Sequence, residues 1–157
     1  MSEVATYYRI VKRQYVDDAF SGDGSMKFGG RWNPKGVPCV YASGSASLAT
    51  LETLVHLQAT GPLPAFVLLT IEVPVAEVRY LAGKDLPSDW RDDPPPLSTM
   101  RLGKGWINSG DGVALVIPST IIPIDSNVIL NVNHSAFKGC LGTVKPAPFE
   151  LDQRLVK

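Results

Sequence analysis

The sequence predicts a single α+β domain, and three observations lead to this prediction. The chain has 157 residues, a length that suits one domain, and 45% of them are hydrophobic, which is enough to form a core. Residues 66–73 form a continuous apolar run, Phe-Val-Leu-Leu-Thr-Ile-Glu-Val, typical of a strand buried on both faces. Residues 45–58 instead carry apolar residues at helical spacing. No repeat or linker divides the chain, so we expect one domain over residues 1–157.

Strands make up most of the predicted elements. Short apolar segments indicate strands, and the loose alternation of the tail indicates an edge strand. The predicted strands span residues 7–11, 37–42, 66–73, 78–81, 113–117 and 127–132, with the edge strand at 149–156.

Two helices are predicted between these strands. The first spans residues 45–58, with Ser43 or Ser45 as its N-cap, and a Gly-Pro pair ends it. The second spans residues 98–108 and begins at Ser98, although two internal glycines weaken its pattern. Segments rich in glycine or proline are predicted to be loops, at residues 17–30 and 83–96.

Composition and charge exclude several classes of function. The chain carries 15 Lys and Arg and 15 Asp and Glu, whereas a protein that binds nucleic acid usually shows a basic excess. No apolar run reaches the roughly 18–20 residues that cross a membrane, and residues 1–13 lack the apolar core of a signal peptide. Cys39 and Cys140 are too few for a disulfide framework. We therefore expect a cytoplasmic protein that binds neither nucleic acid nor a membrane.

The most informative segment is Gly29-Gly30-Arg31-Trp32-Asn33. A glycine pair lets the backbone approach a ligand closely. The arginine that follows can grip a phosphate with two parallel hydrogen bonds. The segment is therefore a candidate for binding a phosphate-bearing ligand.

A glutamate, Glu52, stands inside the first predicted helix. At about 100° per residue, Leu48, Leu51 and Val55 define a buried stripe, and Glu52 falls about 40° beyond Leu48, at its edge. A carboxylate at this position is costly unless it is paired or used in function. One alternative is a buried ion pair between Glu52 and Arg31 that only joins the helix to the loop.

Taken together, these segments resemble the RES domain family. The resemblance rests on Gly-Gly-Arg-Trp-Asn at 29–33, Val-Tyr-Ala at 40–42 and Leu-Ala-Thr-Leu-Glu-Thr-Leu-Val-His at 48–56. The family is named after an arginine, a glutamate and a serine, which Arg31, Glu52 and Ser119 match. Near the C-terminal end the family often carries prolines around an Asn and a His, and this chain does not, so His134 is left out of the predicted site.

The resemblance implies an enzyme with a fold like that of the ADP-ribosyltransferase toxins. It implies a bacterial toxin that cleaves the nicotinamide–ribose bond of NAD, with NAD as substrate and no separate cofactor. It also implies a partner, an antitoxin with a helix-turn-helix domain that blocks the active site, and a toxin homodimer within the complex.

The chemistry of this bond suggests a role for each candidate residue. Nicotinamide leaves as a neutral molecule, and the ribose becomes oxocarbenium-like. We expect Glu52 to stabilise that positive charge and Ser119 to hydrogen-bond Glu52 or the ribose. Arg31 would clamp a phosphate, and Tyr41 would offer its ring face to the cationic nicotinamide. Arg9 is a second candidate for the phosphate or for bracing Glu52, with a structural ion pair as the alternative.

Other classes of function remain open at this point. A Ser–His–acid hydrolase would use Ser119, either His56 or His134, and Glu52, but no nucleophile-elbow motif supports it. A metal site has no suitable ligand spacing, so none is expected. A binding domain for a nucleotide or a partner protein is the non-enzyme alternative. Among enzymes, the ADP-ribosyl group can pass to water, to phosphate or to a protein side chain.

Overall fold

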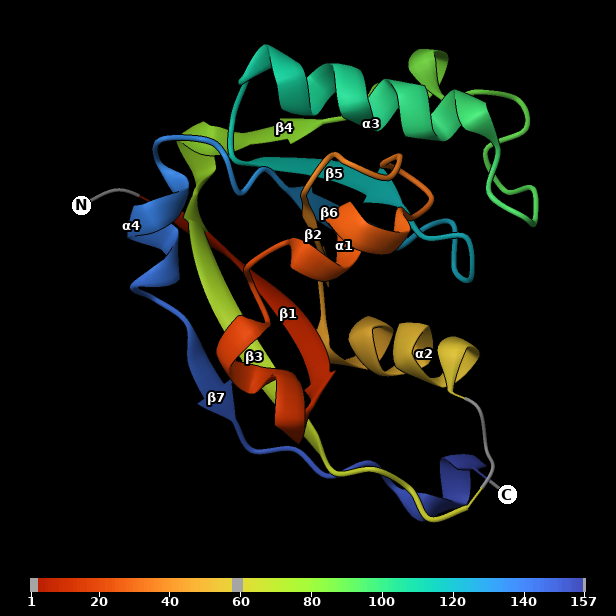
Figure 1. The fold of residues 1–157 in the computed structure, drawn as a ribbon, viewed down its shortest axis with the longest axis vertical. Helices are drawn as coiled ribbons and strands as arrows, with labels where there is room; N and C mark the ends of the chain where they lie inside the picture. Colours follow the sequence, from red (N-terminus) through yellow and green to blue (C-terminus); the bar gives the residue numbers. More distant parts are fainter. Residues whose placement is uncertain (1–2, 58–60, 157) are drawn as a thin grey trace.

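A mixed seven-stranded sheet runs through the protein (Figure 1). The computed structural model describes residues 3–57 and 61–156. Within them, the strands are β1 (Val4–Lys12), β2 (Val40–Ser43), β3 (Phe66–Pro74), β4 (Val78–Tyr80), β5 (Ala114–Pro118), β6 (Ser126–Leu130) and β7 (Lys145–Ala147). Their order across the sheet is β4-β5-β6-β2-β1-β3-β7. Only β4 and β5 are parallel neighbours, and the other pairs are antiparallel.

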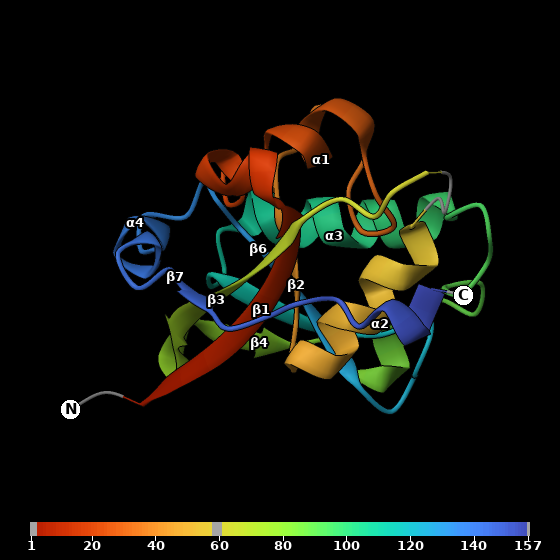
Figure 2. The same ribbon diagram turned by 90° about the horizontal axis from the view of Figure 1, so that it is seen from below.

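Helices flank this sheet. The α-helices in the described residues are α1 (Asp23–Phe28), α2 (Ala46–His56), α3 (Leu97–Ser109) and α4 (Phe137–Leu141). Short 3₁₀ turns lie at Arg13–Asp18, Val75–Glu77, Gly83–Asp85 and Gln153–Val156. Figures 1 and 2 place α2 and α4 on opposite sides of the molecule. Among the described segments, no helix has the length and apolar character needed to cross a bilayer.

The sheet is narrowest where β1 meets β2. β1 pairs with β3 along its whole length, from Val4 to Lys12, but it pairs with β2 only through Tyr8 and Ser43. The strands on either side of this junction run in clearly different directions (Figure 1). At this junction the Ser43 end of β2 is therefore joined to β1 by a single residue pair.

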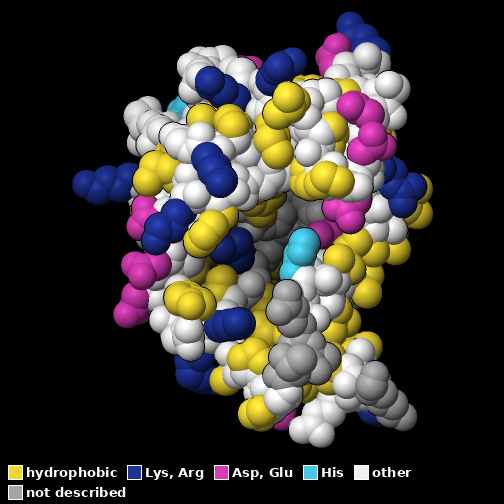
Figure 3. Space-filling view, turned by 45° about the vertical axis from the view of Figure 1, so that its right-hand side comes forward, with side chains coloured by type: hydrophobic (Ala, Val, Ile, Leu, Met, Phe, Trp, Pro, Cys, Tyr) yellow, Lys and Arg dark blue, Asp and Glu magenta, His cyan; other side chains and the backbone are white. Residues whose placement is uncertain are grey.

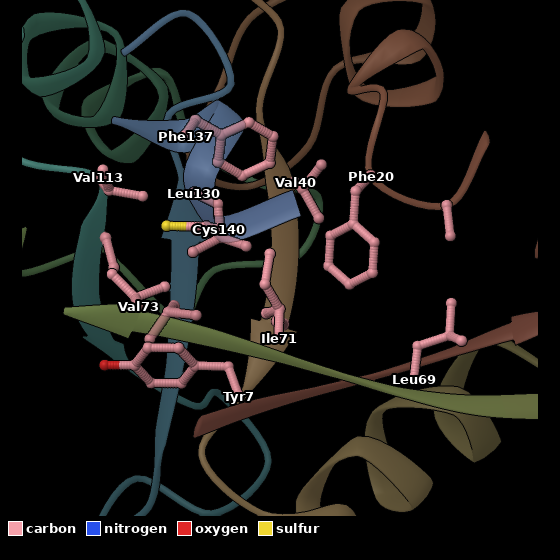
Figure 4. Close-up of a cluster of buried hydrophobic side chains, with 14 of the residues drawn as sticks. Tyr7, Phe20, Val40, Leu69, Ile71, Val73, Val113, Leu130, Phe137 and Cys140 are labelled. Atoms are coloured by element: carbon pink, nitrogen blue, oxygen red, sulfur yellow. The ribbon is translucent and has the colours of Figure 1, made fainter. Parts of the chain in front are cut away.

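Side chains of β2 and β6 alternate between two hydrophobic clusters. Val40 and Leu130 point into the larger cluster, together with Ile71 (Figure 4). Tyr41 and Ile129 point into the smaller one, which also contains side chains of α3. Ser43 follows Tyr41 by two residues on β2, so it points to the same face as Tyr41, the face that carries the smaller cluster.

The predicted α+β fold class is confirmed. The segments predicted as strands overlap β1, β2, β3, β4, β5 and β6. The strand predicted at 37–42 begins only at Val40, because the Val37 carbonyl accepts a hydrogen bond of 2.9 Å from Asn33 Nδ2 instead of joining the sheet.

Two segment predictions are wrong. The predicted loop at 17–30 contains α1, which begins after Gly22 with φ +80°. The predicted edge strand at 149–156 ends instead in the 3₁₀ turn Gln153–Val156, because Asp152 accepts a hydrogen bond of 2.9 Å from the Arg154 backbone N–H. The edge of the sheet is formed by β7, which pairs with β3.

Both predicted helices exist. Ser45 caps α2 by accepting a hydrogen bond of 3.1 Å from the Leu48 N–H, whereas position 58 lies outside the described residues. α3 begins at Leu97, one residue before its predicted start, with Pro96 at the N-cap position. Its Gly103 has a packing reason, since a Cβ there would lie 1.7 Å from the Trp32 carbonyl oxygen.

Candidate active site

A tight turn at residues 30–33 presents Arg31. The Gly30 N–H donates to the Asn33 carbonyl at 2.9 Å, and the Asn33 N–H donates back to the Gly30 carbonyl at 3.4 Å. Tyr41 holds this turn from β2: its hydroxyl accepts from the Trp32 N–H at 2.9 Å and donates to Asn33 Oδ1 at 2.6 Å. A Cβ at Gly30 would lie 2.7 Å from that hydroxyl oxygen, so the close approach requires glycine.

The Tyr41 hydroxyl is therefore fully engaged. Burial raises the pKa of the Tyr41 phenol well above 10, and the charge of nearby Arg31 opposes this rise only in part. The phenol stays protonated, and its O–H donates to Asn33 Oδ1. A contact between this side chain and a ligand would therefore have to use the ring, which packs against the smaller hydrophobic cluster.

Arg31 is held by the loop that precedes α3. Its Nη1 donates to the carbonyl oxygens of Trp90 at 2.9 Å and Asp92 at 2.7 Å. Its own carbonyl accepts a hydrogen bond of 2.6 Å from the hydroxyl of Thr99, on α3. One nitrogen of the guanidinium is thus occupied, and Nε and Nη2 remain as donors.

Arg9, on β1, lies beside β2. Its Nε donates to the Ala19 carbonyl and its Nη1 to the Tyr41 carbonyl, each at 2.8 Å. Burial lowers the pKa of the guanidinium, because desolvation disfavours the cation. The ion pairs among the described residues do not include Arg9, so the predicted alternative of a structural ion pair is wrong.

Glu52 lies on the inner face of α2. Leu48 and Ala49, one turn before it, are buried, whereas Leu51 and Val55 are 38% and 62% exposed. The predicted stripe of Leu48, Leu51 and Val55 is therefore wrong: the helix turns its Leu48–Ala49–Glu52 side inward. No ion pair joins Glu52 to Arg31 within the described residues, so the alternative in which these two residues only bridge helix and loop is also wrong.

Two side chains hold the Glu52 carboxylate. Its Oε1 accepts from the Ser119 hydroxyl at 2.9 Å and from Asn127 Nδ2 at 3.0 Å. Ser119 is completely buried, and its oxygen also accepts from the N–H groups of Ile121 and Ile122 at 3.1 and 3.2 Å. Oε2 of Glu52 has no hydrogen-bond partner in the described part of the chain.

The sequence did not single out Asn127 or its partner Ser43 as site residues. The Ser43 hydroxyl donates to Asn127 Oδ1 at 2.7 Å, and the two residues face each other across β2 and β6. The available signal was an amide side chain beginning a segment that is otherwise apolar, Asn-Val-Ile-Leu.

Four of the predicted site residues fall into two groups on one side of the sheet, whereas Arg9 alternates with Tyr8 on β1 and points to the other face, with Tyr7 and Val11. Arg31 and Tyr41 form the first, and Glu52 with Ser119 forms the second. Ser43 links them, since it follows Tyr41 by about 7 Å along β2 on the same face. Figure 3 looks onto the side of the molecule on which α2 lies and shows a central hollow with basic side chains along one flank.

The arrangement does not suit a Ser–His–acid hydrolase. The Ser119 hydroxyl donates its hydrogen bond to Glu52, not to a histidine. His134 precedes α4 on the other side of the molecule, where its Nε2 lies 3.7 Å from Glu77 Oε2. His56 ends α2 and is exposed. The described residues contain no cluster of three His, Cys, Asp or Glu side chains that could hold a metal ion.

Residues 6–152 match the RES domain. The chain belongs to the RES-domain toxin family. It is 43% identical to a protein named Toxin Res from Yersinia enterocolitica over 148 residues, which cover 94% of this chain and 97% of that one. It is 38% identical to the Prs ADP-ribosylating toxin of a Sphingobium species over 140 residues, which cover 85% of this chain and 86% of that one.

A solved structure shares the fold of this RES protein. In the crystal structure of the MbcT–MbcA toxin–antitoxin complex of M. tuberculosis, one chain matches with a TM-score of 0.69 and 21% identity. The match covers 94% of this chain and 84% of that chain. The predicted family resemblance is therefore confirmed, while the roles of the individual site residues stay predictions.

Proposed function

We propose that this RES protein is the toxin of a toxin–antitoxin pair and that it degrades NAD by hydrolysing the nicotinamide–ribose bond. The observation that carries the proposal is the Glu52 carboxylate, which two donors hold at Oε1 while Oε2 is left without a partner among the described residues. A fixed carboxylate of this kind suits a reaction in which positive charge develops on a sugar. The names of the relatives, toxins in each case, support the toxin role.

In the proposed reaction the bond from ribose C1 to the nicotinamide nitrogen breaks, and the bonding electrons leave with nicotinamide. The leaving group departs neutral and needs no general acid. Water then adds to C1 and releases a proton, which gives ADP-ribose. Glu52 would stabilise the oxocarbenium-like sugar and accept a hydrogen bond from a ribose hydroxyl through Oε2.

The two arginines and Tyr41 would bind the rest of the dinucleotide. Arg9 is a mostly buried cation without a carboxylate partner in the described residues, and a buried charge is costly unless it is paired. A phosphate would supply that partner. Arg31 retains two guanidinium nitrogens for a phosphate oxygen, and the Tyr41 ring face would pack on the nicotinamide. No separate cofactor is needed, because NAD itself is consumed.

The test is NAD loss, both in cells and with purified protein. Induction of the toxin without its antitoxin should stop growth while NAD falls. Purified protein should convert NAD to nicotinamide and ADP-ribose, detected by mass spectrometry. Growth arrest at a constant NAD level would contradict the proposal.

Transfer to a protein is the second candidate, because one relative is named an ADP-ribosylating toxin. The same mass-spectrometric assay separates the outcomes. Free ADP-ribose indicates hydrolysis, a phosphorylated ADP-ribose indicates phosphorolysis, and ADP-ribose attached to a protein of a cell extract indicates protein modification.

We propose that this toxin acts in the cytoplasm and that its partner is a helix-turn-helix antitoxin that covers the NAD site, with the toxin as a homodimer in the complex. The shared fold with one chain of a solved toxin–antitoxin complex supports an antitoxin partner. Exposed Leu51 and Val55, on the helix that carries Glu52, add apolar surface near the site. The co-purified complex should consume no NAD; a complex as active as the free toxin would contradict occlusion.

A further inference from the structure

We propose that Asn127 and Ser43 are positioning residues that fix the direction of the Glu52 carboxylate through a relay of hydrogen bonds. This inference rests on the proposed function in one respect, since NAD turnover is its main readout. The relay runs from the Ser43 hydroxyl to Asn127 Oδ1 at 2.7 Å, and from Asn127 Nδ2 to Glu52 Oε1 at 3.0 Å. It joins β2, β6 and α2.

The direction of each bond in the relay is determined by chemistry. An ionised carboxylate only accepts hydrogen bonds, so the amide must turn its NH₂ group toward Glu52. The amide oxygen then faces Ser43, which must donate its hydroxyl proton. If the Ser43 hydroxyl is removed, nothing at position 43 selects between the two orientations of the Asn127 amide. The flipped orientation places Asn127 Oδ1 against the Glu52 carboxylate.

The relay gives the Glu52 carboxylate a second hydrogen-bond donor. Ser119 approaches Oε1 from the loop after β5, and Asn127 approaches the same oxygen from β6. Two donors from different elements restrict the carboxylate more than one donor can. They also occupy one oxygen only, which leaves Oε2 without a partner among the described residues.

Among the described residues, Asn127 is the side-chain hydrogen-bond partner of Ser43. It is 4% exposed, and Ser45, not Ser43, caps α2. A buried hydroxyl in a strand costs free energy unless it is hydrogen-bonded. Alanine has nearly the same size as serine and would fill this position without that cost. The Ser43 hydroxyl is therefore explained by the amide that it orients.

A purely structural role would instead make the relay an anchor of α2 on the sheet. In that case removal of the relay lowers thermal stability but leaves the turnover of the folded enzyme unchanged. If the relay positions Glu52, kcat falls while KM for NAD stays nearly constant, because the phosphate and nicotinamide contacts are not touched.

The experiment is a double-mutant cycle on purified protein. Asn127→Ala should lower kcat on the order of 10- to 100-fold, since a displaced catalytic group costs up to about 100-fold. Ser43→Ala should lower kcat about three- to tenfold. In an Asn127→Ala background, Ser43→Ala should have no further effect on kcat, because its action passes through the missing amide.

Thr143→Ala is the matched control. The Thr143 hydroxyl also makes partly buried hydrogen bonds, accepting from the Glu72 N–H at 2.8 Å and donating to the Cys140 carbonyl at 2.7 Å, but it lies by α4. This variant should lose stability and keep the parent kcat. A Ser43→Ala protein with the parent kcat, or a Ser43→Ala effect that persists in full without Asn127, would overturn the relay.

Nuclear magnetic resonance separates failure of the relay from failure of the proposed function. The Asn127 side-chain amide signal should shift on Glu52→Gln and again on Ser43→Ala, whether or not the protein consumes NAD. If the parent protein consumes no NAD but both shifts occur, the proposed function fails and the relay stands. If neither substitution moves the signal, the relay is wrong.

Discussion

The hydroxyl of Ser119 donates a hydrogen bond of 2.9 Å to Oε1 of Glu52, although the two residues are 67 positions apart in the sequence. The Ser119 hydroxyl oxygen also accepts from the N–H groups of Ile121 and Ile122, and Ser119 is fully buried. Every hydrogen-bonding direction of this hydroxyl is therefore used. Ser119 holds a carboxylate and two loop amides, and this geometry does not suit a nucleophile.

Ser119→Ala should reduce both stability and turnover. It leaves two loop N–H groups without their acceptor, and an unsatisfied buried group costs about 1–3 kcal/mol. In a chain of this size each kcal/mol lowers Tm by about 2–4 °C. Thermal melting and kcat measured on one preparation check this. Ser135→Ala is the control and should change neither, because Ser135 is exposed and its side chain makes no hydrogen bond among the described residues. Parent kcat in Ser119→Ala would remove Ser119 from the site.

Arg31 is predicted to act through the geometry of its guanidinium. Arg31→Lys keeps the charge but cannot reproduce the bonds of Nη1 to Trp90 and Asp92 together with a fork toward phosphate. Hydrogen bonds to charged groups contribute about 1.5–3 kcal/mol, so kcat/KM should fall on the order of 10- to 100-fold. Hydrogen exchange should also quicken in the loop before α3. Exposed Arg101→Lys is the control, and an Arg31→Lys protein with the parent kcat/KM would exclude the phosphate role.

The predictable part of this fold is the part in which local pattern and burial agree. β3 carries a continuous apolar run, and five of its nine residues, Leu68 to Ile71 and Val73, are buried. The face of α2 was predicted wrongly, because periodicity locates apolar residues and does not tell which of them meet the core. Leu51 and Val55 satisfy the helical pattern and still face outward.

The site was predictable in its residue types and in only one of its pairings. Glycine, arginine and glutamate at their observed spacing identified the Gly30–Asn33 turn and Glu52. The predicted hydrogen bond from Ser119 to Glu52 is confirmed, whereas the second donor, Asn127, which β-sheet pairing brings to α2, was not predicted. Contacts of this kind depend on strand order, which single-sequence patterns do not encode.

Tyr41→Phe tests whether the hydroxyl is structural and the ring functional. The change leaves the Trp32 N–H and Asn33 Oδ1 without their partner, so the free energy of unfolding should fall by about 1–3 kcal/mol. The ring remains, so the folded variant should keep more activity than Tyr41→Ala. Equal loss of kcat/KM in the two variants would contradict a role for the ring face.

Tyr41 should also make the stability of the protein depend on pH. Burial raises the pKa of Tyr41 well above 10, so the folded state holds this proton more tightly than the unfolded chain. The contribution to stability is present in full below about pH 10 and is lost as the pH rises further. Burial also raises the pKa of Tyr7, to about 12, and adds the same trend. Tm measured from about pH 8 to 11 should fall less steeply in Tyr41→Phe than in the parent.

Glu52→Gln tests the proposed mechanism most directly. Glutamine keeps a carbonyl oxygen that can accept from both Ser119 and Asn127, and no ion pair with Arg31 is broken. The loss of about 3–5 kcal/mol that follows removal of one partner from a buried ion pair is therefore not expected. What the variant lacks is the negative charge that faces the oxocarbenium-like sugar. Loss of one such preorganised contact lowers rates on the order of 10²–10³, so kcat should fall by that factor while NAD binding stays nearly unchanged.

The measurement of Glu52→Gln combines Tm, NAD affinity and kcat on the same preparation. Exposed Glu150→Gln removes one negative charge elsewhere and should match the parent in all three. An unfolded Glu52→Gln protein would indicate that the carboxylate serves the structure through its charge after all. A folded variant that binds NAD and turns it over at the parent rate would end the assignment of Glu52 as the catalytic carboxylate. A folded variant that binds NAD and has lost turnover is the expected result, since two hydrogen-bond donors hold Oε1 and the charge on Oε2 is the feature that the substitution removes.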